Sequence, residues 1–192
     1  GETTWNSEGK LQGMLAAPLS ERGTAQTSGT VQYLSDVPFQ LVLTSPLQRT
    51  RAMADPVARH LGLSPIVLPD LQEIDFGNWE AHVWSEIESA YPDSVRAWGL
   101  RSMTARPEGG ESLAEVATRA RRVRLFLEST PATPVLVVSH GAFGRVLIPV
   151  LLDLALSAGE EFDLPNGSVS IFTLDPAGWR TGVIGCTDHL TR

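Results

Sequence analysis

The sequence has a single cysteine, Cys186, among its 192 residues, which excludes an internal disulfide and favours a reducing compartment. Its apolar runs are too short to cross a bilayer, which argues against a membrane span. The net charge of −7, with no cluster of lysine and arginine spanning one face, argues against nucleic acid as the main partner. We therefore expect a cytoplasmic protein with a single domain over residues 1–192, whose 42% hydrophobic content is ordinary for a globular core.

Short apolar runs alternate with longer amphipathic runs along the chain, and this alternation predicts an α/β fold. Strands are expected at 39–45, 66–68 and 135–138, with a hairpin over 168–184. Helices are expected at 20–34, 46–61, 83–90, 94–101, 112–128 and 142–156. Strands that alternate with helices at this spacing favour a mostly parallel central sheet covered on both faces, which is a three-layer α/β/α sandwich.

The stretch from Pro134 to Arg145 is the first candidate for a functional site. Its strand residues are uncharged and mostly β-branched, which is typical of a strand buried on both faces. The strand ends at Ser139 and His140, and Gly141 then opens a helix whose N-terminus offers unpaired backbone N–H groups to an anion. Since open α/β sheets bind ligands at the carboxyl ends of their strands, His140 is a candidate functional residue. The alternative is a histidine that only caps a loop.

Other loops and strand ends carry polar side chains that suit the same chemistry. Arg49 follows the strand over 39–45, Glu73 lies in an irregular stretch, and Asn6 and Gln12 lie in a glycine-punctuated segment that predicts a loop. An arginine and a histidine near a helix N-terminus suit a dianionic phosphate, and a carboxyl group suits a general acid. Taken singly, each residue also has a purely structural interpretation as a surface charge or a loop polar group.

Seven short motifs follow one another with fitting gaps, and together they resemble the histidine phosphatase superfamily, the phosphoglycerate-mutase-like proteins. These motifs are G-E-T-T-W-N-S-E-G-K-L-Q-G, P-L-S-E-R-G, S-P-L-Q-R, L-Q-E-I-D-F-G-N-W-E, G-G-E-S, V-V-S-H-G and P-N-G-S. The resemblance covers nearly the whole chain. It implies a phosphoglycerate-mutase-like fold and a small phosphorylated substrate.

The resemblance also implies a role for each polar candidate. Arg49 and His140 would bind the transferring phosphoryl group, and Glu73 would be the proton donor. Further residues would line the same phosphate pocket, namely Asn6, Gln12, Gly13 and the backbone of Gly141. The family reaction runs through a phosphohistidine, which is covalent catalysis, and it uses no metal and no cofactor.

One departure from the family pattern concerns the nucleophile. In the family, Arg-His precedes the opening loop and this histidine is the nucleophile, whereas the present sequence begins at the glycine. The apolar strand that leads into the pair is also absent, and a domain without this central strand would have unpaired backbone edges. We therefore expect the intact protein to carry these residues. His60, His82 and His189 are not expected to replace the nucleophile, and His140 is assigned to the other side of the phosphate.

The sequence thus predicts a phosphatase that hydrolyses a small phosphomonoester. Phosphoglycerate mutase-type transfer is one alternative, although only residues 81–108 separate the Glu73 motif from G-G-E-S, and this short segment favours an open pocket and hydrolysis. The second alternative is a non-catalytic phosphate-binding module, if the nucleophile is truly absent. Trp79 and His82 are candidates for contact with the rest of the substrate, with core packing as the other explanation for the tryptophan. The family also suggests a homodimer.

Overall fold

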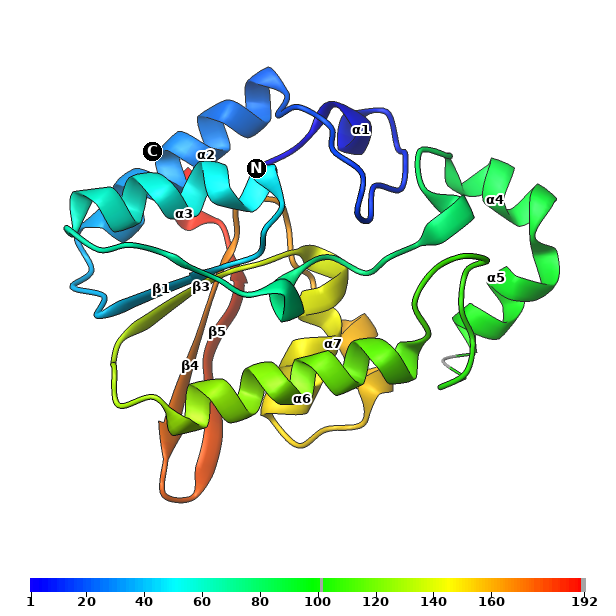
Figure 1. Cartoon of the computed structure of the whole chain (residues 1–192). Coiled ribbons are helices and arrows are strands. Elements are labelled where there is room, and N and C mark those ends of the chain that lie inside the picture. Colours follow the sequence, from blue (N-terminus) through cyan, green and yellow to red (C-terminus); the bar gives the residue numbers. More distant parts are fainter. Residues whose placement is uncertain (101, 191–192) are drawn as a thin grey trace.

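The centre of the fold is a parallel sheet of three strands with the order β2-β1-β3. The structure is a computed structural model that describes residues 1–100 and 102–190 (Figure 1). The strands are β1 (Leu41–Thr44), β2 (Ile66–Val67) and β3 (Val135–Val138). Strands β1 and β3 pair along their whole length, from Leu41 opposite Val135 to Thr44 opposite Val138. The expected parallel sheet is confirmed, with β2 as its short exposed edge.

Helices cover both faces of this sheet, which confirms the three-layer architecture. Figure 1 shows α2 (Glu21–Ser35) and α3 (Gln48–His60) on one face and α6 (Leu113–Ser129) and α7 (Gly141–Leu151) on the other. Successive strand residues point to opposite faces, so Val42 packs in the α2 and α3 layer while Leu43 packs in the α6 and α7 layer. Both side chains are fully buried.

The hairpin predicted at the end of the chain is confirmed. It consists of β4 (Val169–Asp175) and β5 (Gly178–Cys186), which pair antiparallel around the turn between Asp175 and Gly178. Within the described ranges these two strands form a sheet of their own, next to the three-stranded one.

Two sequence expectations differ from the structure. The opening segment contains a helical turn, α1 (Thr4–Ser7), because the Thr3 side chain accepts a hydrogen bond from the Asn6 backbone and the Asn6 side chain accepts one from the Thr3 backbone. In addition, α7 ends at Leu151 instead of 156, because Asp153 has a positive φ of 54° that turns the chain.

Short helices form further parts of the chain. The predicted pair after Glu80 is present as α4 (Trp84–Ala90) and α5 (Pro92–Gly99), and residue 101 of the second expectation lies outside the described residues. Figure 1 shows α4 and α5 to one side of these layers. Within the described ranges, 3-10 turns are formed by η1 (Pro69–Leu71), η2 (Gly77–Trp79), η3 (Leu156–Glu161) and η4 (Asp188–Leu190). Among the described residues, no helix combines the length and apolar character that a membrane crossing requires.

Candidate active site

Arg49 occupies the first turn of α3, directly after β1, and its guanidinium joins three parts of the site. Its Nε donates to His140 Nδ1 at 3.2 Å, which links the ends of two neighbouring strands. Its Nη2 donates to the Gly13 carbonyl at 2.6 Å and its Nη1 to the Leu15 carbonyl at 3.3 Å. A guanidinium is the side chain whose planar fork can bind several acceptors at once. The opening loop is therefore attached to the carboxyl end of the sheet.

His140 is the N-cap residue of α7, and both of its ring nitrogens are bonded. Because a guanidinium can only donate, Nδ1 is the acceptor toward Arg49 and Nε2 carries the proton, which it donates to Ser45 Oγ at 2.8 Å. Burial, followed by the positive charge of Arg49, lowers the pKa of His140 well below its ordinary value of 6.5. The imidazole is therefore neutral at physiological pH in the unliganded site.

Glu73 binds the N-terminus of α7 with its carboxylate. It accepts hydrogen bonds from the backbone N–H groups of Phe143 at 2.7 Å, Ala142 at 3.2 Å and Ile74 at 2.9 Å. The anion-binding end of this helix is thus partly occupied by a side chain of the protein, while Gly141 is exposed at its first position. Burial raises the pKa of Glu73, against the opposite effect of these donors and of Arg49. A raised pKa suits a carboxyl group that donates a proton near neutral pH.

Asn6 and Gln12, both predicted to bind phosphate, contact Thr3 in the opening loop. Asn6 Oδ1 accepts from the Thr3 backbone at 2.9 Å and so helps to begin α1. Gln12 Oε1 accepts from the Thr3 hydroxyl at 2.9 Å, and its Nε2 donates to the Leu15 carbonyl at 3.2 Å. Both side chains therefore order the loop, and their contact with phosphate stays a prediction.

Glu80 orders the same loop, and sequence reasoning did not single it out. This buried carboxylate accepts from the backbone N–H groups of Met14 at 2.8 Å, Leu15 at 3.0 Å and Phe76 at 3.1 Å. Glu80 thus binds the N–H groups of Met14 and Leu15 in the loop, and Arg49 binds the carbonyls of Gly13 and Leu15. An acid inside an irregular, glycine-containing stretch is the only signal in the sequence that could have indicated this role.

Trp79 and His82 have different surroundings. Trp79 is fully buried and packs edge-to-face against Trp84 and Trp98, with ring centres 5.9 Å and 6.0 Å apart. Core packing therefore accounts for the presence of this tryptophan. His82 is about half exposed, its Nδ1 lies 3.3 Å from Glu86 Oε2, and its carbonyl accepts from Leu11 N at 2.9 Å. His82 thus lies beside the opening loop, and its contact with substrate stays a prediction.

The remaining histidines lie elsewhere in the structure. His60 is exposed in the last turn of α3, and His189 stacks on Tyr33 at 4.9 Å and contacts Thr30. All four histidines of the sequence fall within the described residues, and His140 alone among them contacts Arg49.

Comparison with known proteins shows the family. A sequence model of the histidine phosphatase superfamily (branch 1) matches residues 1–187. Phosphoserine phosphatase 1 of Hydrogenobacter thermophilus is 34% identical over 178 residues, which are 91% of this chain and 83% of that protein. A probable phosphoglycerate mutase of Cronobacter sakazakii is 29% identical over 200 residues, 99% of this chain and 91% of that protein.

A solved structure agrees with these relatives. The α-ribazole phosphatase from Shigella flexneri has a TM-score of 0.87 and 27% identity, and the match covers 97% of this chain and 93% of that one. The chain belongs to branch 1 of the histidine phosphatase superfamily, as the motif resemblance predicted. Its relatives are named as phosphatases and mutases, and the family implies a phosphorylated small-molecule substrate.

We expect the imidazole of His140 to titrate well below pH 6.5 in the unliganded protein and to shift upward in Arg49→Gln. Loss of the guanidinium removes a positive charge that disfavours the imidazolium. NMR titration of the histidine ring signals measures both values. Arg59→Gln, which changes an exposed arginine at the other end of α3, is the matched control and should leave His140 unchanged. An unshifted His140 in Arg49→Gln would contradict the electrostatic link.

Gly13 is a second testable position, because it has a φ of +54° and an added Cβ would lie 1.9 Å from Glu80 Oε1. We expect Gly13→Ala to lower the free energy of unfolding by about 2 kcal/mol or more. Gly9 also has a positive φ of +71°, but its Cβ would meet nothing within 4 Å, so Gly9→Ala should cost only about 1 kcal/mol. Urea unfolding compares the two. Equal losses would mean that the contact with Glu80 is unimportant.

Proposed function

We propose that the protein is a phosphatase that hydrolyses a small phosphomonoester through a phosphohistidine intermediate. The observation that supports this most is the meeting of three groups at the carboxyl ends of β1 and β3. The Arg49 guanidinium bonds the neutral His140 imidazole, and Glu73, with its raised pKa, lies at the N-terminus of the adjacent helix. Family membership supports the same reaction class.

The proposed reaction has two steps. A histidine nitrogen attacks phosphorus and the bond from phosphorus to the alcohol oxygen breaks, while Glu73 gives its proton to that oxygen. Water then attacks the phosphohistidine, the phosphorus–nitrogen bond breaks, and the Glu73 carboxylate takes a proton from the water. Throughout, Arg49 stabilises the charge on the phosphoryl oxygens and the N–H of His140 donates to one of them.

The proposal requires a nucleophilic histidine, which the family carries in an Arg-His pair directly before the opening loop.

The experiment that tests this requirement is the intact mass of the native protein together with the sequence of its first peptide. The proposal expects a mass above the 20.7 kDa of these 192 residues and a peptide with Arg-His before Gly1. If the mass equals 20.7 kDa, a non-catalytic phosphate-binding module replaces the phosphatase.

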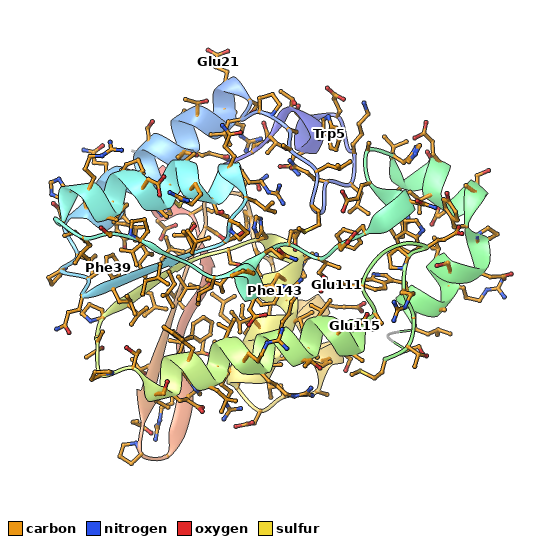
Figure 2. All side chains as sticks on the ribbon, in the orientation of Figure 1. Trp5, Glu21, Phe39, Glu111, Glu115 and Phe143 are labelled. Atoms are coloured by element: carbon orange, nitrogen blue, oxygen red, sulfur yellow. The ribbon has the colours of Figure 1, made fainter. Side chains whose placement is uncertain are left out.

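In the full-length protein, we expect Glu73→Gln to slow hydrolysis of an alkyl phosphomonoester by about 100-fold or more. The rate of hydrolysis of nitrophenyl phosphate should fall far less, because nitrophenolate leaves without a proton. Steady-state kinetics on both esters measures the difference. Glu21→Gln, which changes an exposed acid at the start of α2, is the control and should leave both rates unchanged (Figure 2). Equal losses on both esters in Glu73→Gln would contradict the donor role.

The pH profile gives an independent readout of the same group. A carboxyl group donates only while it is protonated, so the rate on the alkyl ester should fall as pH rises through the pKa of Glu73, which burial places above 4.5. The rate on nitrophenyl phosphate should not fall in this pH range, and Glu73→Gln should remove the fall from the pH profile of the alkyl ester.

Mutase-type transfer is the second candidate, because one relative is named as a probable phosphoglycerate mutase. A mutase assay with a bisphosphate primer separates the two functions. Phosphoryl transfer that is faster than hydrolysis would favour the mutase. The substrates in the relatives' names, phosphoserine and α-ribazole phosphate, are the first two compounds to include in a phosphatase screen.

A further inference from the structure

Arg119 on α6 is a buried arginine whose side chain is only 5% exposed, and all five of its N–H groups are bonded. Nε and Nη2 each donate to one carboxylate oxygen of Glu111 at 2.9 Å. Nη1 donates to the carbonyls of Asp70 at 3.0 Å and Gln72 at 2.7 Å, and Nη2 also donates to the Glu73 carbonyl at 3.0 Å. The guanidinium thus binds the backbone of the segment that carries Glu73.

This segment depends on such side chains for its conformation. After the 3-10 turn at Pro69–Leu71 the chain enters neither a helix nor a sheet before Gly77, so its carbonyls have no ladder partners. The Leu71 carbonyl accepts from Ser139 Oγ at 2.6 Å. Together with the three carbonyls bound by Arg119, every carbonyl from residue 70 to residue 73 is bonded to a side chain.

Glu111 extends the same contacts to the other side of Glu73. Its Oε2 accepts from the Asp75 backbone N–H at 3.0 Å, and its own N–H donates to the Asp75 carbonyl at 2.8 Å. Its carboxylate is also the counterion of the buried guanidinium, which would otherwise be an unpaired buried charge. Arg119 and Glu111 therefore fix the backbone on both sides of Glu73.

Phe143 provides a second route from Arg119 to the Glu73 carboxyl group. The guanidinium carbon lies 4.4 Å from the centre of the fully buried Phe143 ring. The backbone N–H of Phe143 in turn donates to Glu73 Oε1 at 2.7 Å. Figure 2 shows Phe143 and Glu111 on the side of α6 that faces the rest of the domain. One guanidinium thus contacts both the backbone of Glu73 and the residue that binds its carboxylate.

We propose that Arg119, with Glu111 as its counterion, is a positioning residue that holds the Glu73 carboxyl group in the geometry for proton transfer. The inference rests on the proposed role of Glu73 as proton donor. Proton transfer requires hydrogen-bond reach between the acid and the leaving oxygen, so a displaced Glu73 loses the transfer while Arg49 and His140 still bind the phosphoryl group.

The test is Arg119→Lys in the full-length protein, because lysine keeps the charge but lacks the planar five-donor fork. We expect kcat on the alkyl phosphomonoester to fall about tenfold or more, with a change of less than about threefold on nitrophenyl phosphate. Competitive inhibition by inorganic phosphate should be unchanged. A lysine that only destabilised the fold would lower both rates together.

Arg122→Lys is the matched control. Arg122 lies one turn further along α6 and binds the Asp70 carboxylate at the surface, where its side chain is 56% exposed. Arg122 thus binds a side chain of the same segment, whereas Arg119 binds the backbone carbonyls of that segment. Both rates should be unchanged in this variant.

A double variant decides between positioning and general damage. If Arg119 acts through Glu73, adding Arg119→Lys to Glu73→Gln should cause no further loss on the alkyl ester, because the proton transfer is already absent. Additive losses, or equal losses on both esters in Arg119→Lys alone, overturn the proposal. If Arg119→Lys does not fold, as judged by circular dichroism, Glu111→Gln is used in its place with the same expected selectivity for the alkyl ester.

These measurements also separate this inference from the proposed function. If Glu73→Gln itself shows no difference between the two esters, Glu73 is not the donor and both proposals fail. If Glu73→Gln shows the difference and Arg119→Lys does not, the donor assignment stands and the positioning role is wrong.

Discussion

The parallel pairing of β1 with β3 is the constraint on which the site depends. Parallel strands in register end at the same edge of the sheet, so the chain after Thr44 and the chain after Val138 leave the sheet side by side. This brings Arg49 within hydrogen-bond distance of His140, although 91 residues separate them in the sequence. The alternating burial of Val42 and Leu43 against the two helical layers sets the register, because a shift by one residue would exchange the two faces.

Charged side chains order the irregular segments around this edge. Helices and strands satisfy most of their own backbone groups, whereas several backbone groups of the opening loop and of the segment around Glu73 are bonded to side chains. The Glu80 carboxylate binds N–H groups of the opening loop, and the Arg49 guanidinium binds carbonyls of the same loop. The Arg119 guanidinium binds carbonyls of the segment around Glu73. The side chains that order these segments therefore lie among the proposed site residues or next to them. Their removal would therefore affect both stability and chemistry.

Sequence reasoning was most successful where the signal was local. The apolar run before His140 predicted β3, and the helix predicted at 112–128 is present as α6, which begins at a capping box formed by Ser112 and Glu115. Arg49 and His140, which the family resemblance assigned to one site, lie within hydrogen-bond distance of each other at the sheet edge. Sequence reasoning was less successful in irregular stretches: the loop role of Glu80 depends on N–H groups 65 and 66 residues away, and the role of Arg119 on carbonyls 46 to 49 residues away. Distant partners of this kind leave no periodic pattern in the sequence.

The sequence by itself determined the family, the alternation of strands and helices, and the identity of the polar residues at the strand ends. Hydrophobic periodicity and short motifs contain this information because both can be recognised from residues that are neighbours in the sequence. Only the tertiary structure decided that Glu73 occupies the N-terminus of α7, that Trp79 is core, and that Asn6 and Gln12 bind Thr3. The physical reason is that a polar side chain can satisfy any nearby backbone group, and folding alone determines which group is near.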